Sequence, residues 1–156
     1  MDGMAAADVT DCPPAGPDPI RVSAVVLLRA DGRALSVRKA GTRMFMFPGG
    51  KPEPGESPLQ TAVREVAEET GIRLRPEELT FLGVREAAAA NEAGYQVVGD
   101  VFALSRPLTA DEVPATAAEI ADLTWLDPSA PEAPEGCGLA PLLQSVLVWI
   151  SAQPPF

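Results

Sequence analysis

Residues 50–72 read GKPEPGESPLQTAVREVAEETGI, and this stretch decides both the fold and the chemistry of the chain. It places three carboxylates, Glu65, Glu68 and Glu69, at positions i, i+3 and i+4, which share one face of a helix. Like charges at this spacing destabilise a helix by roughly 0.2–0.5 kcal/mol per pair. A divalent cation removes the repulsion, because Mg²⁺ binds carboxylate oxygens and keeps waters or substrate phosphates as its other ligands. The alternative is an ordinary solvated acidic helix face.

The neighbouring residues predict a helix over residues 57–71 that follows a loop. Ser57 has the form of an N-cap, Pro58 suits the first helical position, and Gln60 completes a capping box. Gly71 is placed to end the helix in a left-handed conformation. Residues 48–56, PGGKPEPGE, are too rich in Pro and Gly for regular structure. The loop can therefore bring backbone carbonyls and a side chain to an ion held by the helix.

The stretch resembles the signature box of the Nudix hydrolases, G-x5-E-x7-R-E-U-x-E-E-x-G-U, in which U is a bulky aliphatic residue. All nine constrained positions match, namely Gly50, Glu56, Arg64, Glu65, Val66, Glu68, Glu69, Gly71 and Ile72. The resemblance implies an α/β fold of the Nudix type, an α/β/α sandwich with a mixed β-sheet. It also implies a Mg²⁺-dependent hydrolase, with Mn²⁺ as a substitute, that cleaves a diphosphate linkage.

The resemblance also implies roles for individual residues. The metal ligands would be the carbonyl oxygen of Gly49 and the carboxylates of Glu65, Glu68 and Glu69. Arg64 would hold the glutamates by charge-assisted hydrogen bonds, for which a planar guanidinium is suited. Glu56 would lie behind the ligands or assist a water. Together with Glu68 and Glu69, both are expected to serve catalysis, although Arg64 could also form an ordinary helix salt bridge and Glu56 could be an exposed turn residue.

A catalytic base is still needed, and in many members of the family it comes from a loop before a late strand. Glu119 occupies the corresponding place, ahead of the segment IADLTWL at residues 120–126. We predict that Glu119 is an additional ligand or the base. Glu112 is a rival position, and a surface glutamate on an acidic loop is the ordinary alternative.

Composition narrows the chemistry and the partners. The chain has no histidine, which excludes Ser-His-Asp and Cys-His nucleophiles and His-based zinc sites. Cys12 and Cys137 are far apart in sequence and are expected to be free thiols in a reducing compartment. The net charge of −10 disfavours nucleic-acid polymers. Basic residues nevertheless outnumber acidic ones between residues 20 and 51, so a small phosphate-bearing ligand fits.

The substrate is less well determined than the reaction. Arg38, which lies ahead of the box, and Lys51, beside the expected metal loop, are predicted to contact substrate phosphates. The alternative for each is an ordinary solvated residue. Four aromatic residues could stack on a nucleobase or belong to the core: Phe45, Phe81, Tyr95 and Phe102. A compact chain with little outside the minimal fold favours a nucleoside triphosphate pyrophosphohydrolase. The alternatives are an ADP-ribose or nucleotide-sugar pyrophosphatase and a non-catalytic nucleotide sensor. An isoprenoid diphosphate isomerase is disfavoured, because that chemistry needs histidine.

The 156 residues are expected to form a single domain over residues 20–152, after an acidic, flexible tail at residues 1–19. A second helix is predicted after Pro141, with an apolar stripe that could serve the core or a homodimer interface. No apolar stretch is long enough to span a membrane, so we expect a cytoplasmic protein without a membrane partner. Strands are predicted at residues 22–28, 34–38, 44–47, 79–85, 96–104 and 124–126.

Overall fold

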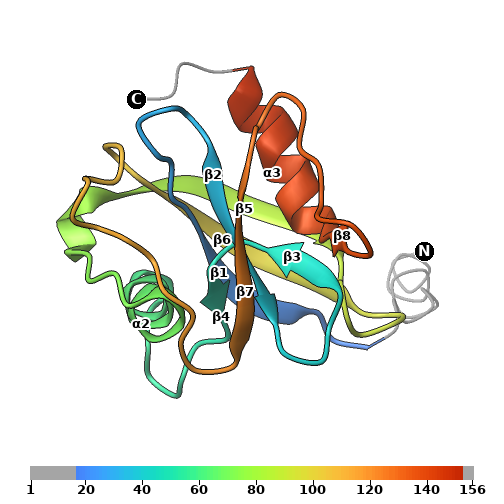
Figure 1. The fold of residues 1–156 in the computed structure, drawn as a ribbon. Helices are drawn as coiled ribbons and strands as arrows, with labels where there is room; N and C mark the ends of the chain where they lie inside the picture. The colour runs from blue at the N-terminus through green and yellow to red at the C-terminus, as the bar shows by residue number, and fades with distance from the viewer. Residues whose placement is uncertain (1–16, 153–156) are drawn as a thin grey trace, which may run out of the picture.

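Two four-stranded sheets and two α-helices make up the part of the chain that the computed structural model describes, residues 17–152 (Figure 1). The elements, in chain order, are β1 (Ile20–Val26), β2 (Ala34–Lys39), β3 (Met44–Met46), β4 (Gly49–Gly50), α2 (Pro58–Thr70), the 3-10 helix η1 (Pro76–Glu78), β5 (Leu79–Ala88), β6 (Gln96–Leu104), β7 (Ile120–Leu126), β8 (Gly138–Leu139) and α3 (Pro141–Ser151).

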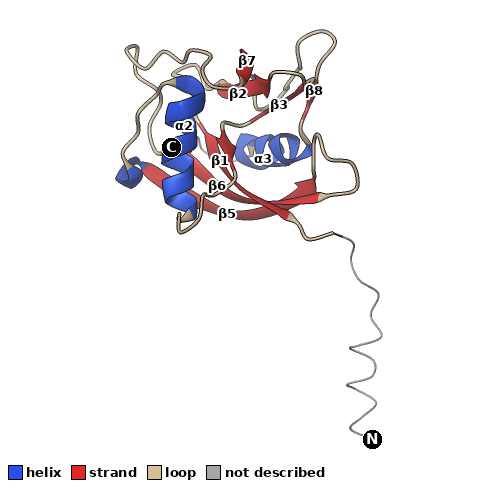
Figure 2. Ribbon diagram, turned by 90° about the horizontal axis from the view of Figure 1, so that it is seen from below, coloured by secondary structure: helices blue, strands red, loops and turns tan. Residues whose placement is uncertain are grey.

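Both sheets are mixed. The first has the strand order β4-β1-β6-β5, in which β1 and β6 run parallel and the other neighbours are antiparallel. The second has the order β7-β2-β3-β8, with β3 and β8 parallel. The α/β class with mixed strands is confirmed, but the strands divide into two sheets that meet where β1 passes into β2. Figure 2 shows α3 between the two sheets and α2 beside them.

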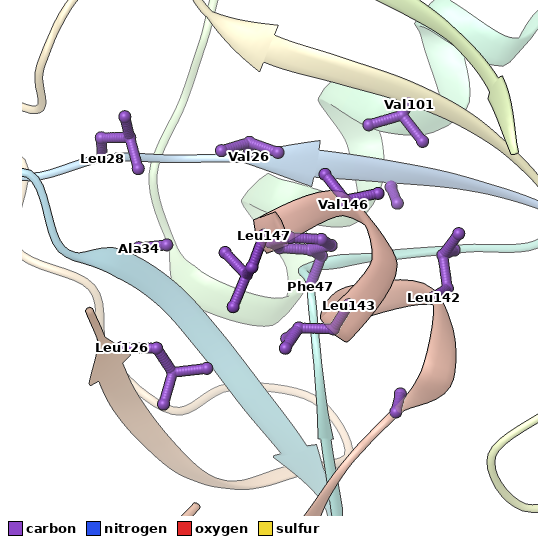
Figure 3. Packing of buried hydrophobic residues seen from close by; sticks show 12 residues of the cluster. Val26, Leu28, Ala34, Phe47, Val101, Leu126, Leu142, Leu143, Val146 and Leu147 are labelled. Atoms are coloured by element: carbon purple, nitrogen blue, oxygen red, sulfur yellow. The ribbon is translucent and has the colours of Figure 1, made fainter. Parts of the chain in front are cut away.

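The central strand β1 supplies both hydrophobic clusters of the domain. Ala24 and Val26 pack into the cluster formed with α3, whereas Val25 packs into the cluster formed with α2. This division follows from strand geometry, since successive side chains point to opposite faces. Figure 3 shows the α3 cluster, with Leu143 and Leu147 of the helix beside β1 and β2. One apolar strand therefore fixes the positions of both helices.

The predicted ends of α2 are confirmed. The Gln60 amide donates to Ser57 Oγ at 3.1 Å, and the Ser57 amide donates to Gln60 Oε1 at 2.8 Å, which completes the capping box. Gly71 ends the helix with φ 79°. The C-terminal helix also begins at its predicted proline, and its buried side chains are Leu142, Leu143, Val146 and Leu147.

Several boundaries differ from the sequence prediction. Strand β5 continues to Ala88, three residues beyond its predicted end, and β7 begins at Ile120, four residues before its predicted start. Cys137 is a free thiol, as expected. Cys12 and most of the predicted tail lie outside the described residues. Neither α2 nor α3 has the length and hydropathy that crossing a bilayer requires.

Candidate active site

The two glycines of β4 lie between β1 and α2, where no side chain would fit. A Cβ on Gly49 would lie 2.9 Å from the backbone carbonyl carbon of Ser23, and one on Gly50 would lie 2.6 Å from Cδ of Glu65. The Ser23 hydroxyl also donates to the Pro58 carbonyl at 2.8 Å, which ties β1 to the start of the helix. Glycine at both positions thus lets α2 bring its carboxylates against the backbone of β4.

Glu69 is the most deeply buried carboxylate at this site, with 2% of its surface exposed. Its Oε1 accepts a hydrogen bond from the Gly49 amide at 3.0 Å. Burial raises the pKa of Glu69 to about 8, and the neighbouring Glu65 adds to the rise despite that hydrogen bond. Burial likewise raises the pKa of Glu65. Two carboxylates that resist ionisation at the same place are stabilised by a bound cation.

Glu68, the third predicted ligand, is directed differently. Its side chain is half exposed, and its Oε1 accepts a hydrogen bond from Arg64 Nη1 at 3.0 Å. Glu65 and Glu69 are four residues apart and lie nearly in line along the helix, whereas Glu68 is 100° away from Glu69 around the axis. The structure therefore brings two of the three carboxylates to β4 and leaves Glu68 on Arg64.

Arg64 is held by four side-chain and backbone acceptors. Its Nε donates to Glu56 Oε2 at 2.7 Å, and its Nη2 donates to the Lys51 carbonyl at 3.1 Å. The hydrogen bonds from Arg64 lower the pKa of Glu56 to about 2, so that carboxylate is charged. The remaining contacts of the guanidinium are to the carboxylates of Glu65 and Glu68. Glu56 thus fixes Arg64, and Arg64 in turn fixes the loop and two box glutamates.

A cavity of about 400 Å³ opens beside these residues. Its polar part includes Glu65, both glycines of β4, and the side chains of Lys39, Lys51 and Glu119. Its apolar part lies where β1 and β6 begin, since Ile20 pairs with Val97 and both line the cavity. The apolar walls are completed by Val22, Met46, Phe47, Ala140, Leu142 and Leu143. The cavity therefore joins a charged region to an apolar one.

The structure brings some predicted site residues to this cavity and not others. Lys51 and Glu119 line it. The rival Glu112 instead accepts hydrogen bonds from Arg106 at 2.7 and 3.0 Å. Arg38 does not line the cavity, because its Nη1 donates to the Thr42 carbonyl at 2.8 Å and its Nη2 lies 4.0 Å from Asp122. The adjacent Lys39, over which the sequence analysis preferred Arg38, lines the cavity instead.

The strand period could have separated Arg38 from Lys39, since neighbours on a strand point to opposite faces. The four aromatic residues that the sequence offered for stacking are not part of the cavity wall, although Phe47 is. Phe45 and Phe102 are buried in the core, which was the alternative to stacking on a nucleobase. Phe81 and Tyr95 are exposed and do not line the cavity.

The donors at β4 fit a hard cation. Mg²⁺ takes oxygen ligands and is held by one or two carboxylates while it keeps waters and phosphates. Glu65, Glu69 and the Gly49 carbonyl would supply such a set. Within residues 17–152, no three acidic, His or Cys side chains converge as an all-protein cage. The fit of the site to a cation therefore depends on the two carboxylates of Glu65 and Glu69 and on the oxygen of Gly49.

A sequence model of the NUDIX domain matches residues 18–144, which covers the described fold from β1 to the start of α3 and the whole site. The chain belongs to the NUDIX domain family. A MutT-like protein from Streptomyces ambofaciens is 37% identical to this NUDIX chain over 103 residues, which is 66% of this chain and 60% of that protein. A Bacillus subtilis protein named "Putative 8-oxo-dGTP diphosphatase" is 28% identical over 104 residues, 67% of this chain and 64% of its own length. The match thus spans less than two thirds of either relative.

The fold of this NUDIX domain is also found among solved structures. A MutT NUDIX hydrolase from Burkholderia pseudomallei superposes with a TM-score of 0.67 and 22% sequence identity, covering 85% of this chain and 98% of that one. At this identity the likeness concerns the fold alone. It confirms the Nudix fold that the signature box implied.

Proposed function

We propose that this chain is a Mg²⁺-dependent hydrolase that cleaves a diphosphate linkage in a nucleoside diphosphate derivative, with nucleoside triphosphates as its main substrates. The observation that carries the proposal is the convergence of Glu65 and Glu69 on Gly49 and Gly50, beside a cavity with both a charged and an apolar region. The names of two relatives, MutT-like protein and 8-oxo-dGTP diphosphatase, support the same reaction class.

Each residue of the charged region has a task in this reaction. A bound Mg²⁺ would neutralise charge on the phosphoryl oxygens and orient a water for in-line attack. Glu65 and Glu69 hold the ion, and Arg64 fixes the loop and the glutamates around it. Lys51 offers an ammonium to the substrate phosphates. Glu119 lines the cavity and is the proposed acceptor of the proton from the attacking water.

The apolar region favours a nucleoside triphosphate over a nucleotide sugar. A second sugar brings several hydroxyl groups, and each hydroxyl buried without a hydrogen-bond partner costs about 1–3 kcal/mol. Away from the charged region, the described residues offer the cavity walls only two polar side chains, Asn91 and Glu92. Pockets for small organic ligands are lined mostly by apolar side chains with a few polar groups. A single nucleoside is therefore the better match.

A phosphate-release screen with Mg²⁺ tests the proposal. The panel comprises nucleoside triphosphates, including oxidised deoxyguanosine triphosphate, together with ADP-ribose, nucleotide sugars and dinucleoside polyphosphates. The Glu69→Gln variant serves as the blank. Turnover of a triphosphate by the wild type, with a loss of at least about a hundredfold in the variant, is expected. If no compound of the panel is hydrolysed but a nucleotide still raises the melting temperature, a non-catalytic nucleotide sensor is favoured.

A further inference from the structure

Lys39 and Glu119 form an ion pair inside the cavity. Lys39 Nζ lies 3.4 Å from Glu119 Oε1, and both side chains line the cavity beside Glu65. The lysine side chain is one third exposed and the glutamate two thirds exposed, so both ends of the pair remain open to ligands. The pair therefore lies within reach of whatever occupies the site.

Two backbone irregularities create this pair. Strands β2 and β7 pair regularly from Ala34 to Arg38, but Lys39 pairs with Ile120 and skips Ala121, which is a β-bulge. Ahead of β7, Ala118 has φ 53°, a left-handed conformation that costs a non-glycine residue about 1 kcal/mol. Bulges and strained residues of this kind cluster at functional sites, where they redirect side chains. Here they bring a lysine and a glutamate together at the mouth of the site.

The ammonium of Lys39 acts on more than its partner. Burial raises the pKa of Glu69 and of Glu65, and the charge of Lys39 offsets part of the rise in both. The charge of Glu119, by contrast, raises the pKa of Glu69. The geometry agrees, since Lys39 pairs with Glu119 and lines the same cavity as Glu65, one of the proposed metal ligands. Arg64 also acts on Glu65, but it is tied to Glu56 and to the loop.

We propose that Lys39 is a displaceable counter-ion of the carboxylate site: its ammonium neutralises the site while no metal is bound, and metal entry releases it toward the phosphate groups of the substrate. This inference rests on the proposed function, because it concerns the same metal site. A divalent cation and an ammonium cannot both lie close to these carboxylates without repulsion. Metal binding therefore frees Lys39, and occupation of Lys39 by phosphate favours metal binding in return, since such coupling is reciprocal.

Binding of Mn²⁺ alone, followed by electron paramagnetic resonance in the absence of nucleotide, tests the inference. Lys39→Gln is expected to bind Mn²⁺ roughly threefold to tenfold more tightly than the wild type, because a competing charge several ångströms away is lost. Lys39→Arg keeps the charge and should stay near the wild-type affinity. Lys51→Gln is the matched control, since Lys51 lines the same cavity and no ion pair joins it to a carboxylate of the described residues.

The outcomes separate this inference from the proposed function. Equal Mn²⁺ affinity in the wild type and Lys39→Gln would overturn the counter-ion role, and so would equal effects of Lys39→Gln and Lys51→Gln. Failure of the wild type to bind Mn²⁺ would overturn both the inference and the metal-dependent function. A third outcome is that Mn²⁺ affinity changes in Lys39→Gln but not in Lys51→Gln, while the wild type hydrolyses nothing in the screen. This outcome would support the counter-ion role of Lys39 and refute only the proposed hydrolase activity.

Discussion

Replacing Glu69 by Gln should stabilise the metal-free protein while it abolishes the effect of metal. The carboxylate is almost fully buried, and Gln has the same shape and an amide oxygen that can still accept the hydrogen bond of the Gly49 amide. The substitution therefore removes a charge and leaves the packing intact. Any change in the free energy of unfolding then reports the cost of that buried charge.

The size of the effect follows from the pKa of Glu69, which burial raises from 4.5 to about 8. A group with a raised pKa in the folded state binds its proton more tightly there than in the unfolded chain, so the fold loses stability as pH rises from 4.5 toward 8. At pH 7 the folded protein keeps Glu69 largely protonated, whereas the unfolded chain releases that proton. At about 1.4 kcal/mol per pH unit, this difference destabilises the metal-free fold by about 3 kcal/mol at pH 7. Below pH 4.5 the cost vanishes.

Urea unfolding in EDTA, at pH 5 and pH 7, measures the effect through tryptophan fluorescence. Glu69→Gln should exceed the wild type by up to about 3 kcal/mol at pH 7 and by about 0.8 kcal/mol at pH 5. Glu68→Gln is the matched control, because it removes the same charge from a half-exposed side chain and should change stability by less than about 1 kcal/mol. Added Mg²⁺ should then stabilise the wild type and not Glu69→Gln. A gain that is the same at both pH values, or no gain at all, would refute the reasoning.

Three further substitutions test other parts of the structure. Gly50→Ala places a methyl group against Glu65, and its kcat should fall by roughly a hundredfold while circular dichroism stays unchanged. Arg64→Lys loses the guanidinium fork, so both kcat and the melting temperature should fall, with a loss of about 1–3 kcal/mol in urea unfolding. Glu112→Gln breaks the pair with Arg106, which holds the pKa of Glu112 at about 2. Because a lowered pKa stabilises the fold above the ordinary value of 4.5, the variant should be less stable at pH 7, and the difference should shrink as pH falls from 4.5 toward 2.

Local signals in the sequence were sufficient for the loop, the helix and the box. The cap at Ser57 and the left-handed Gly71 depend on neighbours within a few residues, and these interactions form as expected. Alternation along β1 likewise reflects the two faces of a single strand. By contrast, β4 and β8 contain two residues each, too few for any periodic pattern. Their positions follow from tertiary contacts alone.

The sequence predicted which residue types form the site but not which way their side chains point. The three box carboxylates share a broad face of α2, yet only Glu65 and Glu69 reach β4, because the 100° step between Glu68 and Glu69 decides which side chain meets the glycines. The strand period separates Arg38 from Lys39 onto opposite faces, but which of the two faces the cavity depends on how β2 packs, and the bulge that sets Lys39 beside Glu119 is not visible in any local pattern. The directions of the site side chains therefore depend on how strands and helices pack together, which the pattern of a single element does not show.

The cavity takes its two halves from separate stretches of the chain. The carboxylates and the glycines come from residues 49–69, whereas much of the apolar wall comes from residues 88–97 and from 140–143 at the start of α3. Leu142 and Leu143 also belong to the buried core, whereas the side chains of residues 88–97 lie mostly outside it. Substitutions in residues 88–97 can therefore alter which molecule the cavity accepts without displacing the glycines or the capped helix of the proposed metal site. Natural selection can therefore change which ligand the cavity binds independently of the proposed metal site. A designer can likewise replace the ligand-binding wall without rebuilding that site.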